Sequence, residues 1–169
     1  SGHLESAVTK AQETLFNADA LETLTDETLV ENALAIYREI VHVPMYYKAI
    51  TKQPEKVREA LHYLLQSKEP LEAKVNALRQ ANGKHYIKGL GKTFWSVFFM
   101  ALDPNENPRW SNKTEDALKS LGMAHWTGQD SPGEVYQHIT EAEQYLAQLH
   151  PEADLYAIDH FMHYVTVLE

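Results

Sequence analysis

The sequence predicts an all-α protein that folds as one compact domain of about eight helices. Apolar residues recur at helical spacing along the 169 residues, and no alternating strand pattern lasts for more than a few positions. The hydrophobic content of 44% is ordinary for a globular chain, and a chain of this length can bury a core without covalent staples. It contains no cysteine, which excludes disulfide scaffolds, thiol nucleophiles and Cys-ligated zinc.

Capping residues and prolines divide the first half of the chain into four predicted helices. The first covers about residues 4–16, and the second begins at the N-cap Thr25 and ends at Pro44. Pro54 and Pro70 each open a further helix, because the missing N–H of a proline costs nothing in the first turn.

Four more helices are predicted after a stop at Asn82-Gly83. Asp103-Pro104 and Gly122 end two of them, the segment 131–134 (Ser-Pro-Gly-Glu) carries a capping signal, and Pro151 opens the last. These helices span about residues 92–102, 112–121, 131–149 and 153–167.

The sequence shows no sign of a membrane or secreted protein. Ser1-Gly2-His3 resembles the remnant of an expression tag, so residues 4–169 are expected to form the single domain. No signal peptide follows, and the apolar runs fall far short of the roughly 18 residues that a membrane span needs. We therefore expect a cytoplasmic protein without a membrane partner.

Charge is distributed unevenly along the chain. The formal net charge of −9 argues against a nucleic-acid partner for the chain as a whole. Residues 1–37 hold one Lys and seven acids (−6), residues 38–119 hold fourteen Lys and Arg and nine acids (+5), and residues 120–169 hold eight acids and no Lys or Arg (−8). This asymmetry indicates that the middle segment contacts something anionic, unless its cations pair with the acidic ends within the fold.

The segment 87–91 (Ile-Lys-Gly-Leu-Gly) carries the clearest functional signal. Two glycines around one apolar residue allow a sharp turn, and Lys92 follows at once as the first residue of a helix. A helix N-terminus after glycines presents free N–H groups and a positive dipole end, which suit a phosphate. Lys84, His85 and Lys88 add basic groups that attract a phosphate backbone. The alternative is a tight helical corner whose lysines are merely solvated.

This segment resembles the helix-hairpin-helix DNA-binding motif, in which the hairpin amides grip a DNA phosphate without reading the sequence. An apolar helix ending in Ala101-Leu102-Asp103, a connector with prolines and a further helix extend the likeness. Over about residues 71–121 the chain is therefore similar to the helix-hairpin-helix superfamily of DNA base-excision glycosylases. The resemblance implies a hairpin between two helices and a DNA partner.

The catalytic positions of that superfamily are not matched. Thr93 stands where the resemblance places the nucleophilic Lys of bifunctional glycosylases, and Asn112 stands where it places the catalytic Asp. A neutral amide cannot act as a general base or stabilise a developing cation as a carboxylate does. The resemblance therefore implies a DNA-binding module without catalytic residues. The alternative is a monofunctional glycosylase that uses a displaced acid, Asp103 or Asp116.

A second resemblance concerns the connector and the end of the chain. Residues 101–118 and 158–164 are similar to the region ahead of the motor domain in McrB-type restriction NTPases. The sequence itself has no GxxxxGK[ST] loop for nucleotide phosphates. This resemblance implies a targeting module of a prokaryotic defence protein, with a modified base as one target and a downstream motor domain in a longer chain.

No cofactor or metal is expected. His160 and His163 are spaced i, i+3 on a helix, but no third ligand is evident, and histidines of a helix surface or core are the commoner case. Trp110 and Trp126 fall near predicted loops, where an indole either stacks on a base or, more often, anchors a core.

The leading hypothesis is a non-catalytic DNA-binding module that grips the phosphate backbone. Its predicted DNA contacts are Lys84, His85, Lys88, Gly89, Gly91, Lys92, Thr93, Arg109, Asn112 and Lys113. A third hypothesis is a protein-interaction domain. The acidic carboxy-terminal segment favours it, because these carboxylates would repel DNA if they shared a face with the turn.

Overall fold

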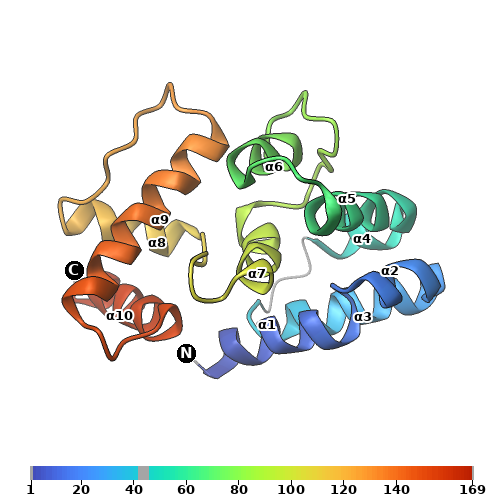
Figure 1. The fold of residues 1–169 in the computed structure, drawn as a ribbon, viewed down its shortest axis with the longest axis horizontal. Helices are drawn as coiled ribbons and strands as arrows, with labels where there is room; N and C mark the ends of the chain where they lie inside the picture. The colour runs from blue at the N-terminus through green and yellow to red at the C-terminus, as the bar shows by residue number, and fades with distance from the viewer. Residues whose placement is uncertain (1, 42–45, 169) are drawn as a thin grey trace.

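The computed structural model describes residues 2–41 and 46–168, and this part of the chain is all-α without strands (Figure 1). The helices are α1 (Gly2–Thr14), α2 (Ala18–Thr23), α3 (Asp26–Arg38), α4 (Tyr47–Thr51), α5 (Pro54–Gln66), α6 (Leu71–Arg79), α7 (Lys92–Leu102), α8 (Asn112–Ser120), α9 (Pro132–Leu149) and α10 (Leu155–Val167). Eight of these ten described helices have nine or more residues, and they correspond to the eight predicted ones. The predicted fold class is therefore confirmed.

The two short helices, α2 and α4, are missing from the predicted set. They have six and five residues, which is too short for an apolar period to be recognised. A local cap supports α2, because the Asn17 side chain accepts a hydrogen bond from the Ala20 N–H at 2.9 Å. The stop predicted at Pro44 lies outside the described residues.

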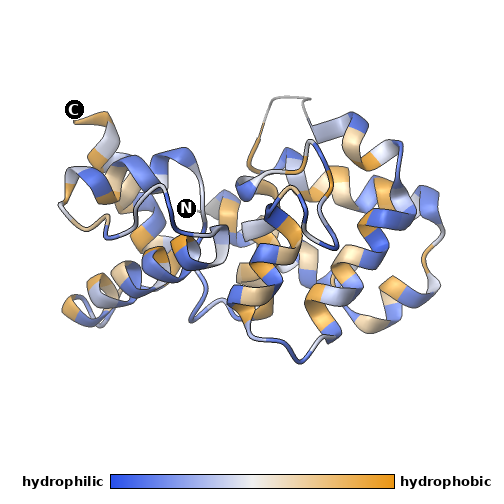
Figure 2. Ribbon diagram, turned by 90° about the horizontal axis from the view of Figure 1, so that it is seen from above, coloured by the Kyte–Doolittle hydropathy of each residue, from blue (hydrophilic) through white to orange (hydrophobic). Residues whose placement is uncertain are grey.

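Helix α7 occupies the centre of the molecule, between two groups of helices (Figure 1). Helices α8 to α10 lie on one side of it and α2 to α6 on the other, while α1 packs against α7, α3 and α10. The two groups also meet directly where α6 packs against α9. Most outer helices carry both hydrophobic and hydrophilic positions in Figure 2, as expected of helices that cover a core with one face.

The central helix is buried on all sides. Every residue from 94 to 101 is buried, including Trp95, Phe98 and Phe99, which confirms the prediction that these aromatic residues belong to the core. Aromatic rings from three other parts of the chain pack against it. The ring pairs, with their centroid distances, are Phe94–Tyr37 (4.9 Å), Phe98–Phe16 (5.4 Å) and Phe99–Tyr136 (5.0 Å).

Side chains fix the connector that leaves α7. Two of the hydrogen bonds satisfy carbonyl groups that the helix itself leaves open at its carboxyl end, and the third holds the connector against the middle of α7. The hydrogen bonds are Asn107 Nδ2 to the Phe99 carbonyl (2.8 Å), Gln12 Nε2 to the Ala101 carbonyl (3.0 Å) and the Trp110 N–H to Ser96 Oγ (2.9 Å). The connector therefore follows a defined path back along α7 towards its amino end.

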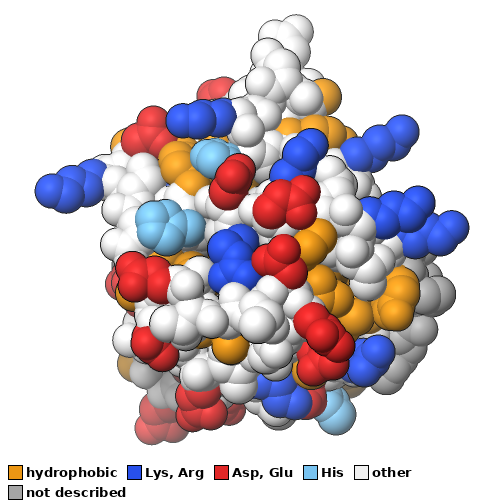
Figure 3. All heavy atoms as spheres, turned by 90° about the vertical axis from the view of Figure 1, so that its right-hand side faces the viewer, with side chains coloured by type: hydrophobic (Ala, Val, Ile, Leu, Met, Phe, Trp, Pro, Cys, Tyr) orange, Lys and Arg blue, Asp and Glu red, His pale blue; other side chains and the backbone are white. Residues whose placement is uncertain are grey.

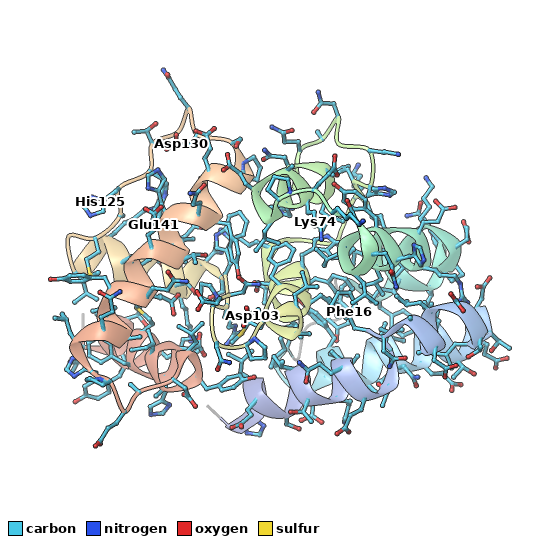
Figure 4. The ribbon with its side chains drawn as sticks, in the orientation of Figure 1. Phe16, Lys74, Asp103, His125, Asp130 and Glu141 are labelled. Atoms are coloured by element: carbon cyan, nitrogen blue, oxygen red, sulfur yellow. The ribbon has the colours of Figure 1, made fainter. Side chains whose placement is uncertain are left out.

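A buried lysine links α6 to α5. Lys74 of α6 is 8% exposed, and its Nζ donates to the carbonyl oxygen of Leu64, near the carboxyl end of α5, at 2.9 Å (Figure 4). Burial lowers the pKa of Lys74. This cation of the basic middle segment therefore supports the fold and is not available to an anionic partner.

The structure does not show the helix-hairpin-helix that the resemblance implies. Helix α6 ends at Arg79, and the twelve residues 80–91 separate it from α7. Residues 80–86 form hydrogen-bonded turns, such as the Gly83 N–H to the Gln80 carbonyl at 2.8 Å, and do not extend the helix. The turn at 87–91 is therefore preceded by a loop, and α6 packs against α9 instead of forming a hairpin arm.

We predict that Gly133→Ala lowers the free energy of unfolding by about 2 kcal/mol or more. A Cβ atom at position 133 would lie 2.3 Å from the carbonyl oxygen of Glu72, so α9 and α6 would have to separate. Chemical denaturation measures the loss. Gly128→Ala is the matched control, because nothing lies within 4 Å of its Cβ position. Equal stability of the two variants would contradict the close approach of α9 to α6.

Candidate nucleic-acid interface

The turn at residues 87–91 brings the backbone to the surface immediately before α7. Ile87 and Leu90 are buried and anchor the turn in the core, and the Leu90 N–H donates to the Ile87 carbonyl at 3.1 Å. Gly89 is exposed and has a φ of 97°, a conformation that costs a residue with a side chain about 1–2 kcal/mol. The sharp turn predicted here is confirmed.

The first turn of α7 has open backbone donors. Gly91 is the N-cap residue, and no side chain caps the helix. The Trp95 N–H makes the first bond to the cap, to the Gly91 carbonyl at 3.1 Å. The N–H groups of Lys92, Thr93 and Phe94 come before this point and have no partner within the helix. Together with the helix dipole they form an end that attracts anions.

Four exposed lysines lie on or beside this turn, and we call them the turn lysines. Two were predicted from the loop, and two come from α4 and its C-cap residue. Helix α4 lies against the turn, since a Cβ on Gly89 would be 3.0 Å from the Cβ of Ala49. None of the four makes an ion pair within the described residues. The turn lysines are Lys48, Lys52, Lys84 and Lys88. The pair on α4 was not identified from the sequence, because only the folded chain brings Ala49 to the turn.

Lys92 has a carboxylate partner inside the protein. Its Nζ forms an ion pair with Glu115 of α8, and the two side chains are 23% and 18% exposed. The indole N–H of Trp110 donates to the same carboxylate at 2.9 Å, and the Lys92 Nζ lies 5.9 Å from the centre of the Trp110 ring. This contact joins the starts of α7 and α8. Trp110 is buried, so the core alternative is confirmed for this residue.

Arg109 is also paired inward. Its side chain is 11% exposed, and Nη1 lies 3.5 Å from Oδ2 of the buried Asp159 on α10. Glu143 of α9 is buried beside this pair. Burial and the Asp159 carboxylate raise the pKa of Glu143 well above its ordinary value. Arg109, Asp159 and Glu143 form a cluster in the interior that ties the connector to α9 and α10.

The remaining predicted contacts differ in their exposure. Asn112 and Lys113 are exposed in the first turn of α8, and Thr93 is partly exposed in the first turn of α7. The start of α8 is closed by a cap, since the Ser111 hydroxyl accepts a hydrogen bond from the Thr114 N–H at 3.3 Å. Of the two helix starts that Lys92 and Glu115 join, α7 therefore offers open donors and α8 does not.

His85 has an aromatic neighbour. Its ring stacks on the ring of Tyr63 from α5, with centroids 4.4 Å apart and an angle of 28° between the planes. Burial and the nearby Lys84 lower the pKa of His85, so its imidazole is neutral near pH 7. A neutral ring in this position serves as a stacking surface more readily than as a phosphate contact.

Charges are not fully segregated on the face formed by α2 to α5 (Figure 3). Lys and Arg side chains gather towards its upper right edge, while carboxylates occupy its centre and lower part. Arg58 is an example of a cation in this region that pairs within the protein. Its guanidinium donates to the carbonyls of Leu21 and Leu24 and to Asp26. An anionic strand on this face would therefore have to follow the cationic edge.

The described residues hold neither a candidate metal site nor a helix that could span a membrane. No group of three or more His, Cys, Asp or Glu in this part of the chain is arranged to hold a metal ion. Its helices are all too short or too polar to cross a membrane. We find no significant match to the chain among protein-family models, curated proteins or solved structures. The functional argument therefore depends on the residues themselves.

We predict that Glu143→Gln stabilises the protein at neutral pH and changes how its stability depends on pH. The raised pKa means that the folded state holds a proton that the unfolded state releases above about pH 4.5, so wild-type stability falls as pH rises through the interval between the two pKa values. The slope for one proton is at most about 1.4 kcal/mol per pH unit. The Gln variant lacks this decline.

Thermal and chemical unfolding between pH 4 and pH 8 measure this difference. Glu141→Gln is the control, because Glu141 is exposed on the same helix (Figure 4). A constant difference between wild type and Glu143→Gln across this range would show that folding does not raise the pKa of Glu143.

Proposed function

We propose that this protein binds the phosphate backbone of DNA through the first turn of α7 and does not catalyse a reaction on it. The observation that carries the proposal is the uncapped helix start at Gly91 beside the turn lysines, which have no carboxylate partner among the described residues. The open N–H groups and the helix dipole hold one phosphate, and the turn lysines attract its neighbours.

Binding of this kind is weak, salt-sensitive and independent of base sequence. The open N–H groups and the turn lysines all bind phosphates, and phosphate contacts position a protein on DNA without reading its bases. The net charge of −9 means that the rest of the surface repels DNA. Affinity therefore comes from cations at short range and falls steeply as the salt concentration rises.

Lys92 and Arg109 support the interface from inside in this proposal. Lys92 contributes its backbone N–H, while its ammonium group holds α8 in place through Glu115. Arg109 fixes the connector through Asp159. The exposed residues Asn112 and Lys113 extend the path of the phosphate strand from α7 to α8.

A glycosylase activity has less support than binding. Asp103 is exposed, and its Oδ1 accepts a hydrogen bond from the Asn105 N–H at 3.2 Å, so it serves as a turn residue (Figure 4). Asp116 is exposed on α8. A carboxyl group that protonates or stabilises a reacting base needs a position sheltered from water. Neither acid has such surroundings.

A protein partner is the second candidate function, and the carboxy-terminal helices favour it. Phe161 and Tyr164 of α10 and its C-cap residue Leu168 follow one face and are 42%, 59% and 68% exposed. No Lys or Arg occurs from residue 120 onward, so the segment that carries this apolar face is itself acidic. A partner with apolar and basic groups fits such a surface. Helices α10 and α4 lie on opposite sides of α7, so a partner on α10 leaves the turn lysines accessible (Figure 1).

The setting of this activity is also part of the proposal. The resemblance of residues 101–118 and 158–164 to the region ahead of the motor in McrB-type restriction NTPases supports a targeting role in a prokaryotic defence protein of the cytoplasm. In that setting the module brings DNA, including DNA with modified bases, to a motor domain in a longer chain.

We predict that Lys88→Glu weakens binding to a short DNA duplex about fivefold to thirtyfold at low salt, which corresponds to roughly 1–2 kcal/mol. The change replaces one attraction with one repulsion at the exposed turn. Fluorescence anisotropy at several salt concentrations measures the affinity. The slope of log affinity against log salt concentration becomes shallower by about one contact.

Lys119→Glu is the matched control for this experiment. It makes the same change of charge at an exposed lysine in the last turn of α8, away from the turn at 87–91. Equal losses of DNA affinity in the two variants would show that only the net charge of the protein matters. The turn would then not be the binding site. If wild type fails to bind DNA even at low salt, the protein-partner candidate takes the place of DNA binding.

A further inference from the structure

We propose that the groove between α5 and the 80–91 loop holds an unpaired nucleobase, stacked on the rings of His85 and Tyr63. The inference rests on the proposed DNA binding and makes it more specific, because single-stranded DNA becomes the preferred form. Phosphates lie outside the groove, along the turn lysines, and one base enters it.

The groove has the size of a small-molecule site. Its volume is about 520 Å³, within the roughly 300–1,000 Å³ that such sites occupy. Arg58, Glu59, His62 and Tyr63 line it from α5, and His85 lines it from the loop. A planar ring therefore finds aromatic and guanidinium surfaces within one open groove.

The aromatic platform is fixed in advance. The Tyr63 and His85 rings already stack on each other at 4.4 Å, and the Tyr63 hydroxyl donates a hydrogen bond to Glu69. Arg58 is held by two carbonyl groups and Asp26. Because these side chains are ordered before binding, a base that stacks on them loses little of its binding energy to ordering the protein.

The charges of the groove favour a neutral ligand. Glu59 lines it, Glu69 lies at the Tyr63 hydroxyl, and the cationic group of Arg58 is already satisfied by its partners. A phosphate would be repelled by the carboxylates and would gain no free cation. A nucleobase carries no charge near pH 7, so it can enter where the phosphate cannot.

The position of the groove matches the proposed path of the backbone. His85 directly follows Lys84 and lies three residues before Lys88, and both lysines are exposed. Proteins that bind single strands combine a cationic track for the backbone with aromatic side chains for the bases. The 80–91 loop supplies both. A base in an intact duplex is paired and stacked, and cannot reach the ring of His85.

The test compares three DNA molecules that carry fluorescent labels. They are a thymidine strand of about ten nucleotides, an abasic strand with the same number of phosphates, and a duplex of equal length. We expect wild type to bind the thymidine strand about fivefold or more tightly than the abasic strand, which is the lower end of the contribution of one stacked base. His85→Ala should remove this preference and leave binding of the abasic strand unchanged.

Two further variants separate stacking from other effects of His85. His85→Phe keeps an aromatic ring and should keep the preference for the thymidine strand. His125→Ala removes an exposed histidine from the loop between α8 and α9, and should change nothing (Figure 4). Circular dichroism of each variant confirms that the fold is retained, and His85→Phe carries the test if His85→Ala unfolds.

The outcomes distinguish this inference from the proposed function. In one outcome, wild type binds the thymidine and abasic strands with equal affinity, and Lys88→Glu weakens binding of both strands. That result would overturn the base site and keep the phosphate site. A preference for the thymidine strand that survives His85→Ala would also overturn it. Failure of all three DNA molecules to bind would overturn both proposals together.

Discussion

Burial of α7 on every side is the constraint on which the rest of the structure depends. Its residues from 94 to 101 are all buried, so no single layer of helices can cover it. Cover comes from α1 and α3 near one end of the chain and from α9 near the other, and the rings of Phe16, Tyr37 and Tyr136 reach the same helix. The domain therefore has two groups of helices around α7, because either group alone would leave one side of α7 in water.

The same burial determines where function can lie. Polar groups at the carboxyl end of α7 are satisfied by Asn107 and Gln12, and that end is closed. Its first turn, by contrast, reaches the surface at Gly91 and Lys92 without a side-chain cap. The anchored turn at 87–91 can present open donors because its position is fixed by buried Ile87 and Leu90. Rigidity in the core thus supports an accessible site at its edge.

Local signals in the sequence were sufficient for the eight longer helices, because prolines, N-caps and apolar spacing act within a few residues. The Ser131–Glu134 capping box is an example, with both of its hydrogen bonds present. The site was only partly predictable, because its contacts join residues that are far apart in the sequence. The pairs Lys92–Glu115 and Arg109–Asp159 join residues distant in sequence, and Ala49 reaches the turn only in the folded chain. A list of basic residues cannot distinguish a cation that pairs with groups inside the fold from one that remains free for a ligand.

That distinction sets the kind of ligand that the protein can hold. The middle segment has a net charge of +5, yet Lys74, Lys92, Arg58 and Arg109 are occupied by carbonyl or carboxylate groups. The cations that remain at the turn are few, and the acidic carboxy-terminal segment opposes any long stretch of duplex. Phosphate contacts alone therefore give little affinity at physiological salt. Tight binding would need a contribution that salt does not screen, and the proposed stacking of a base on the Tyr63–His85 pair would supply one beside the cationic turn.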